Sequence, residues 1–162
     1  MTTTPPSMAA ALRATPRRDW EAEAASRAAG PEIVPHVVAW NLTRRCNLEC
    51  GHCYISAGAW HEAAEEMSTA DCLRVVDEIL EVSPAPMLIL SGGEPLLRED
   101  LETIARRAAD GGATVVVGTN GTRLTTARIR SLKAAGVSGV AVSIDSLDPA
   151  YHDRFRHGAG SL

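Results

Sequence analysis

Residues 37–53 read VVAWNLTRRCNLECGHC, a mostly apolar run that is followed almost at once by three cysteines. The apolar part, Val37–Leu42, has the length and composition of a β-strand. Cys46, Cys50 and Cys53 follow it with the spacing C-x3-C-x2-C. Because this segment is too short to spread three thiols over a helix face, we expect a loop that wraps round a metal.

Downstream of this stretch, strands and helices alternate. Further strands are predicted at 87–90, 114–117 and 140–144. Helices are predicted from Ser68 with an apolar stripe that reaches Leu80, at 100–110 and at about 126–135, with a short helical turn at 148–156. Ser68 and Asp100 are the expected N-caps of the first two helices. The order β-α-β-α-β-α-β requires parallel strands joined by right-handed crossovers. An open doubly wound sheet and part of a barrel both fit this α/β pattern.

Polar residues gather where the strands end. Asn41 closes the first strand, and Ser143 and Asp145 share one face of the last. A parallel strand buried on both sides should be apolar almost throughout. Since α/β folds bind ligands at the carboxyl ends of their strands, these residues indicate a ligand site there.

Composition narrows the class of protein. The chain has 162 residues with 16 Lys and Arg against 20 Asp and Glu, a formal net charge of −4. This mild acidity argues against a nucleic-acid-coating protein, and no apolar stretch approaches the roughly 18 residues of a membrane span. With no export signal in evidence, we expect a cytoplasmic protein with reduced thiols.

The first 35 residues differ from the rest. They are rich in Ala, Thr, Pro and Arg, and only 19–29 reads as a helix, which ends at Gly30-Pro31. We expect residues 1–35 to be an appendage, partly disordered or helical, and residues 36–162 to carry the chemistry.

Three cysteine ligands are an informative number. A structural zinc takes four protein ligands and an all-protein iron–sulfur cluster usually takes four cysteines, so three leave one position open. A Cys3His zinc site that includes His52 is the main alternative, and a disulfide with a spare thiol is a weaker one. Cys72 lies on the apolar stripe of a helix and is expected to be a small buried side chain.

The motifs together resemble those of the radical S-adenosylmethionine (radical SAM) enzymes. The C-x3-C-x2-C loop follows the first strand, Ser91-Gly92-Gly93-Glu94-Pro95 ends the second, Thr119-Asn120-Gly121-Thr122 follows the third and Val142-Ser143-Ile144-Asp145 lies at the fourth. The four motifs occur in the family's order over about residues 37–156.

The resemblance implies a partial (β/α) barrel and a set of functional residues. Cys46, Cys50 and Cys53 would hold three irons of a [4Fe–4S] cluster, while S-adenosylmethionine chelates the fourth. An electron passed through the cluster would then give a 5′-deoxyadenosyl radical that abstracts hydrogen from substrate. The expected cofactor contacts are Tyr54, Gly92, Gly93, Glu94, Asn120, Ser143, Asp145 and Arg156. In particular, Glu94 is expected to pair with the cofactor's ammonium group, and Arg156 with its carboxylate or in a surface salt bridge.

Three stretches, residues 40–46, 88–98 and 152–156, most resemble the tetrapyrrole-modifying branch, which acts on haem and haem d1 side chains. A peptide-modifying maturase of the SPASM type ranks second, a molybdenum-cofactor-type cyclase third, and a non-catalytic zinc or iron–sulfur module remains open. The resemblance also implies a small-molecule or peptide substrate and an electron donor such as ferredoxin or flavodoxin. Because the family barrel has six β/α units and four strands are predicted here, we expect a truncated chain holding the first two-thirds of that domain.

Overall fold

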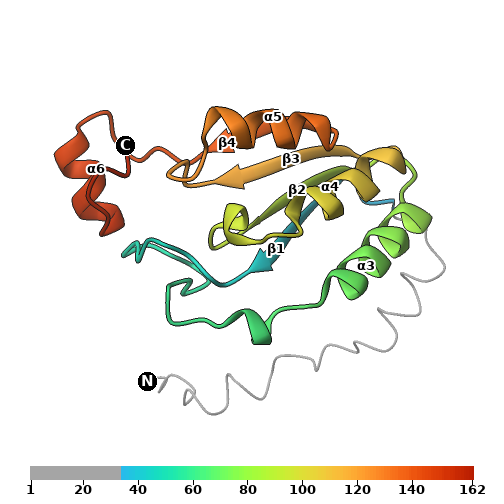
Figure 1. The fold of residues 1–162 in the computed structure, drawn as a ribbon, viewed down its shortest axis with the longest axis horizontal. Coiled ribbons are helices and arrows are strands. Elements are labelled where there is room, and N and C mark those ends of the chain that lie inside the picture. The colour runs from blue at the N-terminus through green and yellow to red at the C-terminus, as the bar shows by residue number, and fades with distance from the viewer. Residues whose placement is uncertain (1–33) are drawn as a thin grey trace, which may run out of the picture. The chain divides into compact units, whose positions relative to one another are not determined.

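The computed structural model describes residues 34–162 (Figure 1). The helix predicted at 19–29 and nearly all of the predicted appendage lie outside these residues. Among the described residues, no helix has both the length and the apolar composition that crossing a membrane demands.

The described residues form one sheet of four parallel strands in the spatial order β1-β2-β3-β4. The strands are β1 (Val37–Thr43), β2 (Met87–Gly92), β3 (Thr114–Thr119) and β4 (Val137–Val142). The connections hold α3 (Thr69–Val82), α4 (Leu101–Asp110) and α5 (Thr126–Ala134), and α6 (Pro149–Arg156) follows β4. Two short 3-10 turns, η1 (Ala63–Glu65) and η2 (Pro95–Leu97), lie in the loops after β1 and β2.

The strand order decides between the two expected architectures. Each connection moves one strand further in the same direction, so right-handed crossovers put their helices on one face of the sheet. A doubly wound sheet would reverse its strand order part-way and use both faces. The partial (β/α) barrel is therefore confirmed.

The core lies between the sheet and these helices. Alternate strand residues such as Leu88, Leu90, Val115 and Val117 are almost completely buried there. The helices contribute the remaining buried apolar side chains, among them Cys72, Val76, Leu101, Ile104, Ala105, Ala108 and Leu132. Cys72 is fully buried in this cluster, which confirms that it is a small core side chain.

Helix starts follow the sequence only in part. Ser68 caps α3 as predicted, because its hydroxyl accepts a hydrogen bond from the Asp71 amide at 3.2 Å. Asp100 does occupy the N-cap position of α4. However, its carboxylate turns away from the helix to Arg98 and Thr69.

The fourth strand differs from its prediction. β4 begins three residues earlier than expected and ends at Val142, so Ser143 and Asp145 follow the strand instead of lying in it. The reason is its pairing with β3, which extends from Val115↔Val137 to Thr119↔Val142. The pairing with β3 therefore determines where β4 begins and ends, although β4 contains a glycine, Gly139.

Candidate functional site

A cavity of about 190 Å3 lies at the carboxyl end of the sheet. In Figure 1 this end carries both the loop that follows β1 and helix α6. Nine of the eleven predicted site residues line the cavity: Cys46, Cys50, Cys53, Tyr54, Gly92, Gly93, Asn120, Ser143 and Arg156. Glu94 and Asp145 do not line it. Residues separated by more than a hundred positions in sequence are thus brought together.

The first wall of the cavity is the cysteine loop, residues 44–68. Near its start it is held by backbone hydrogen bonds from Cys46 to the Gly58 carbonyl at 3.2 Å and from Gly58 to the Arg44 carbonyl at 3.1 Å. Within it, the Cys53 amide donates to the Cys50 carbonyl at 3.1 Å and closes a tight turn. The loop therefore wraps, as its spacing predicts.

All the cysteines of the cysteine loop are free thiols. The Cys46 sulfur accepts hydrogen bonds from the Leu48 amide at 3.4 Å and from the Asn120 side-chain amide at 3.8 Å. The Cys53 sulfur accepts one from the Ala57 amide at 3.3 Å. Such donors favour the thiolate form, which is the form that binds metals.

Burial acts in the opposite direction on two of these thiols. It raises the pKa of the Cys46 thiol, against the hydrogen bond from the Leu48 amide. Burial also raises the pKa of Cys50, against the nearby positive charge of Arg156. A cation or metal that entered the cavity would relieve this cost by pairing with the thiolates.

The donor chemistry fits an iron–sulfur cluster. Within residues 34–162, no three His, Cys, Asp or Glu side chains lie close enough together to hold a single metal ion. The three thiols nevertheless line one cavity, and amide N–H groups point at two of them. Clusters are held by thiolates on separate irons and tuned by N–H···S bonds, which is the donor set present here.

The second wall is the glycine turn, Ser91–Glu94, at the end of β2. The Gly93 amide donates to the Thr43 carbonyl at 2.8 Å, and the Glu94 amide donates to the Arg45 carbonyl at 2.9 Å. A Cβ on Gly92 would lie 2.4 Å from the Thr43 carbonyl oxygen, and one on Gly93 2.3 Å from that of Arg45. Both glycines are therefore required where the turn meets the start of the cysteine loop, as well as lining the cavity.

Glu94 lies beneath the cavity and is fully buried. Its carboxylate accepts hydrogen bonds from the Thr119 hydroxyl at 2.7 Å, the Asn120 amide at 2.8 Å and the Leu96 amide at 3.0 Å. This differs from the expected carboxylate facing a cofactor ammonium group. The reason is local: Glu94 is the N-cap of η2, so its side chain turns back to the backbone.

The segment after β4 forms a third wall. The Ser143 amide donates to the Thr119 carbonyl at 2.9 Å, which keeps Ser143 beside the end of β3. Asp145 pairs with the buried guanidinium of Arg156 at 2.6 Å. The carboxylate partner of Arg156 in this structure is therefore Asp145, although Arg156 also borders the cavity.

Aromatic rings join α6 to the cysteine loop. The His52 ring stacks on Phe155 with centroids 4.6 Å apart and an interplanar angle of 10°. The Gly51 amide donates to the Phe155 carbonyl at 3.4 Å. Tyr54 stays exposed and donates from its hydroxyl to the Asn41 side chain at 3.1 Å.

A match to the Radical SAM superfamily model extends over residues 40–162, about three-quarters of the chain. The chain belongs to the radical SAM superfamily. Enzymes of this superfamily use a [4Fe–4S] cluster and S-adenosylmethionine, so the resemblance read from the sequence motifs is confirmed.

The chain is similar in sequence to several enzymes of the radical SAM superfamily. The chain is 44% identical over 128 residues to an AdoMet-dependent heme synthase of Methanosarcina barkeri, covering 79% of this chain and 36% of the relative. It is 40% identical to the pre-heme d1 synthase of Dinoroseobacter shibae, covering 77% and 30%. The mycofactocin maturase MftC of Mycolicibacterium smegmatis is 34% identical, with 79% and 32% covered. The chain thus spans about a third of the length of these relatives.

The fold agrees with radical SAM structures. Streptococcus suis SuiB bound to S-adenosylmethionine superposes with a TM-score of 0.64 at 16% identity, covering 91% of this chain and 36% of SuiB. At this identity the likeness concerns the fold alone.

Several cavity residues carried no signal in the radical SAM motifs read from the sequence. Leu48 and Ala57 line the cavity but are ordinary apolar residues whose position depends on how the loop folds. Thr119 belongs to the motif Thr119-Asn120-Gly121-Thr122 but was not among the predicted cofactor contacts. The network round Arg98 was not predicted, since its members are far apart in sequence.

Proposed function

We propose that this chain is the part of a radical SAM enzyme that binds the cluster and much of S-adenosylmethionine. The observation that carries the proposal is the convergence of nine sequence-predicted residues on one cavity at the carboxyl end of the sheet. Their three thiols come from one loop, and the other walls come from the ends of β2, β3 and β4. This is where α/β folds bind ligands.

Cys46, Cys50 and Cys53 are the proposed cluster ligands. When bound, the cluster would supply the electron that cleaves S-adenosylmethionine reductively to methionine and a 5′-deoxyadenosyl group. The chain's own part is to hold the thiolates, with N–H donors from Leu48, Ala57 and Asn120 stabilising their charge.

The remaining proposed contacts divide by their position. Gly92, Gly93, Ser143 and Asn120 offer backbone and small polar groups to S-adenosylmethionine along the strand ends. Tyr54 presents an exposed ring at the rim. Glu94 and Asp145 act one layer behind, because Glu94 holds the Asn120 backbone and Asp145 holds Arg156.

For the substrate we propose a tetrapyrrole whose side chains are modified during haem or haem d1 synthesis. The proposal is supported by the identity to a heme synthase and a pre-heme d1 synthase over most of this chain. Peptide maturation is the second candidate, supported by the 34% identity to mycofactocin maturase MftC. Either reaction requires a one-electron donor of the ferredoxin or flavodoxin class, and a cytoplasmic location would suit both.

Anaerobic reconstitution of the 162-residue chain tests the cofactor proposal. The expected product is a brown protein with about four irons and four sulfides, which yields 5′-deoxyadenosine from S-adenosylmethionine and a reductant. Cys46→Ala, Cys50→Ala and Cys53→Ala should each lose iron, whereas Cys72→Ala, a core cysteine in α3, should retain it. A colourless chain with one bound zinc would favour a non-catalytic zinc module and overturn the proposal.

A further inference from the structure

Arg98 lies outside the cavity but contacts both ends of the cysteine loop. It follows η2 and precedes α4, four residues after Glu94 in the chain. Its side chain is only 4% exposed, although it carries a full positive charge. A buried guanidinium without a place in the cavity requires another explanation.

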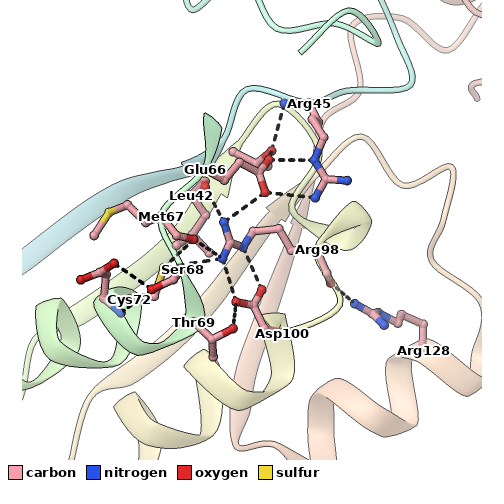
Figure 2. A network of polar contacts seen from close by, with 12 residues as sticks. Leu42, Arg45, Glu66, Met67, Ser68, Thr69, Cys72, Arg98, Asp100 and Arg128 are labelled. Carbon is pink, nitrogen blue, oxygen red and sulfur yellow. Dashed lines mark hydrogen bonds and ion pairs between the residues drawn. The ribbon is translucent and has the colours of Figure 1, made fainter. Parts of the chain in front are cut away.

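The contacts of Arg98 span the cysteine loop from start to finish (Figure 2). One terminal nitrogen donates to the Leu42 carbonyl at 3.2 Å, at the end of β1 where the loop departs. The other donates to the Met67 carbonyl at 3.1 Å, immediately before α3 where the loop returns. One planar group therefore holds together two backbone points 25 residues apart.

Carboxylates on both sides balance the charge. Arg98 reaches Glu66 at 3.2 Å and Asp100 at 2.7 Å, and Arg45 makes a second pair with Glu66 at 2.8 Å. Two arginines and two acids thus neutralise one another. Thr69 also donates to Asp100, and Thr43 donates to Glu66. The end of β1, the start of α3 and the segment after η2 therefore meet at these two acids.

The protonation equilibria agree with these pairings. Burial alone would lower the pKa of Arg98, but the hydrogen bond to Asp100 raises it above its usual value. Burial would raise the pKa of Asp100, but the hydrogen bonds from Arg98 and Thr69 hold it below its usual value. The charged state of the cluster of side chains is therefore the favoured one.

We propose that Arg98 is a positioning residue that closes the cysteine loop at both ends and so sets the placement of the three thiols. The effect of Arg98 on the iron–sulfur cluster rests on the proposed function, whereas its effect on the loop itself does not. The glycine turn and Arg98 lie on the same short segment, so the segment that forms the second wall also closes the first.

The planar fork of arginine is essential to this role. All three of its nitrogens donate, and they serve two backbone carbonyls, two carboxylates and the Cys72 sulfur. A lysine keeps the charge but has a single nitrogen with three donors, so it cannot bridge the same set. Arg98→Lys therefore keeps the positive charge but removes the simultaneous hydrogen bonds to both ends of the loop.

The test is hydrogen–deuterium exchange of the apo 162-residue chain, comparing wild type, Arg98→Lys and Arg98→Met. Amides in 44–58 should exchange about tenfold faster or more in both variants, because they lose charge-assisted hydrogen bonds at the loop ends. Amides of β2 and β3 should change by less than about twofold in Arg98→Lys. Arg107→Met is the matched control, since it removes an exposed ion pair between Arg107 of α4 and Asp77 of α3 and should leave 44–58 unchanged.

A second readout uses the loaded protein. After anaerobic reconstitution, the iron–sulfur absorption of Arg98→Lys should bleach about tenfold faster than wild type in the presence of a chelator. Unchanged exchange of 44–58 in Arg98→Lys would overturn the proposal, and so would an equal acceleration over the whole chain. If wild type binds no cluster, the proposed function fails, while the exchange experiment still decides the role of Arg98.

Discussion

The two main walls of the cavity are built in different ways. The glycine turn ends a central strand, and its glutamate is buried with three hydrogen-bond donors round it. The cysteine loop has a small apolar cluster of its own, Cys46, Leu48 and Ala57, and otherwise depends on contacts from distant segments. Those contacts include ones from Glu94, Arg98, Asn120 and Phe155.

We therefore expect the glycine turn to be the rigid wall and the cysteine loop to be the adjustable one. A loop held by a few side chains and backbone groups opens locally at lower cost than a strand end in a packed sheet. A metal-binding loop benefits from this, because the ligands must close round a group that arrives after folding. The glycine turn can then serve as the fixed reference against which the loop is placed.

Removing the buried carboxylate of Glu94, in the rigid wall, should lower the free energy of unfolding more than any of the changes that follow. Glu94→Ala leaves the Thr119 hydroxyl and two amides without their acceptor, so we expect about 3 kcal/mol or more of lost unfolding free energy in urea. Glu99→Ala removes an exposed acid five residues along and should cost almost nothing. A Glu94→Ala chain as stable as wild type would contradict the assignment of Glu94 to the fold.

Adding a methyl group between the walls should have the next largest effect. A Cβ at position 93 would lie 2.3 Å from the Arg45 carbonyl oxygen and 3.0 Å from the Ala57 Cβ. We expect Gly93→Ala to cost roughly 1–3 kcal/mol in urea unfolding and to speed exchange at the start of the cysteine loop. Gly51→Ala is the control within the same loop, since its Cβ would meet nothing within 4 Å. Equal effects of the two substitutions would show that the walls are not in contact as described.

Weakening the aromatic contact should loosen only the adjustable wall. Phe155→Leu removes the ring that stacks on His52, for an expected loss of about 1 kcal/mol. Exchange at Gly51 should accelerate, while amides of β3 keep their rates. Tyr151→Leu removes a ring that contacts Phe155 but not His52, and should leave Gly51 protected. The reverse ranking of these two variants would contradict the role of Phe155.

Lowering the pH should weaken the ion pairs of Glu66 and Asp100 that anchor the cysteine loop, and this is the smallest of the expected effects. Burial opposes ionisation of Glu66 and Asp100, yet their hydrogen bonds to Arg45 and Arg98 keep both carboxyl pKa values below the usual range. Since their unfolded pKa values are about 4, their stabilisation is complete above that pH and is lost as the pH falls through the lower folded values.

The measurement is the free energy of unfolding between pH 7 and pH 3. The wild-type curve should fall more steeply below pH 5 than that of Glu66→Gln/Asp100→Asn, so the gap between them should narrow. The exposed pair of substitutions Glu62→Gln/Asp110→Asn should follow wild type. Parallel curves for the wild type and the Glu66/Asp100 variant would contradict the depressed pKa values.

The sequence predicts the order of strands and helices better than it predicts the contacts of individual side chains. The strands, their parallel order and the grouping of motifs at strand ends were predictable, because periodicity and parallel topology determine them. The cysteine spacing was enough to predict a wrapped loop. These features are local, or follow from the order of elements along the chain.

Two carboxylates have partners that their sequence patterns did not indicate. Asp100 reads as a helix cap, yet its carboxylate binds Arg98 and Thr69. Glu94 is predicted to contact the cofactor, and in the structure its carboxylate caps η2 and accepts a hydrogen bond from Thr119 at the end of β3. Each acid binds one donor that is near in sequence, Arg98 or the Leu96 amide, and one threonine hydroxyl that only the folded chain brings close.

We propose above that three thiolates bind a cluster and leave one iron to S-adenosylmethionine. Electron paramagnetic resonance of the reduced, oxygen-free chain, before and after addition of S-adenosylmethionine, tests it most directly. We expect a [4Fe–4S]⁺ signal whose g values shift when S-adenosylmethionine is added. A signal that stays unchanged, or a chain that gives none after reconstitution and reduction, would contradict it.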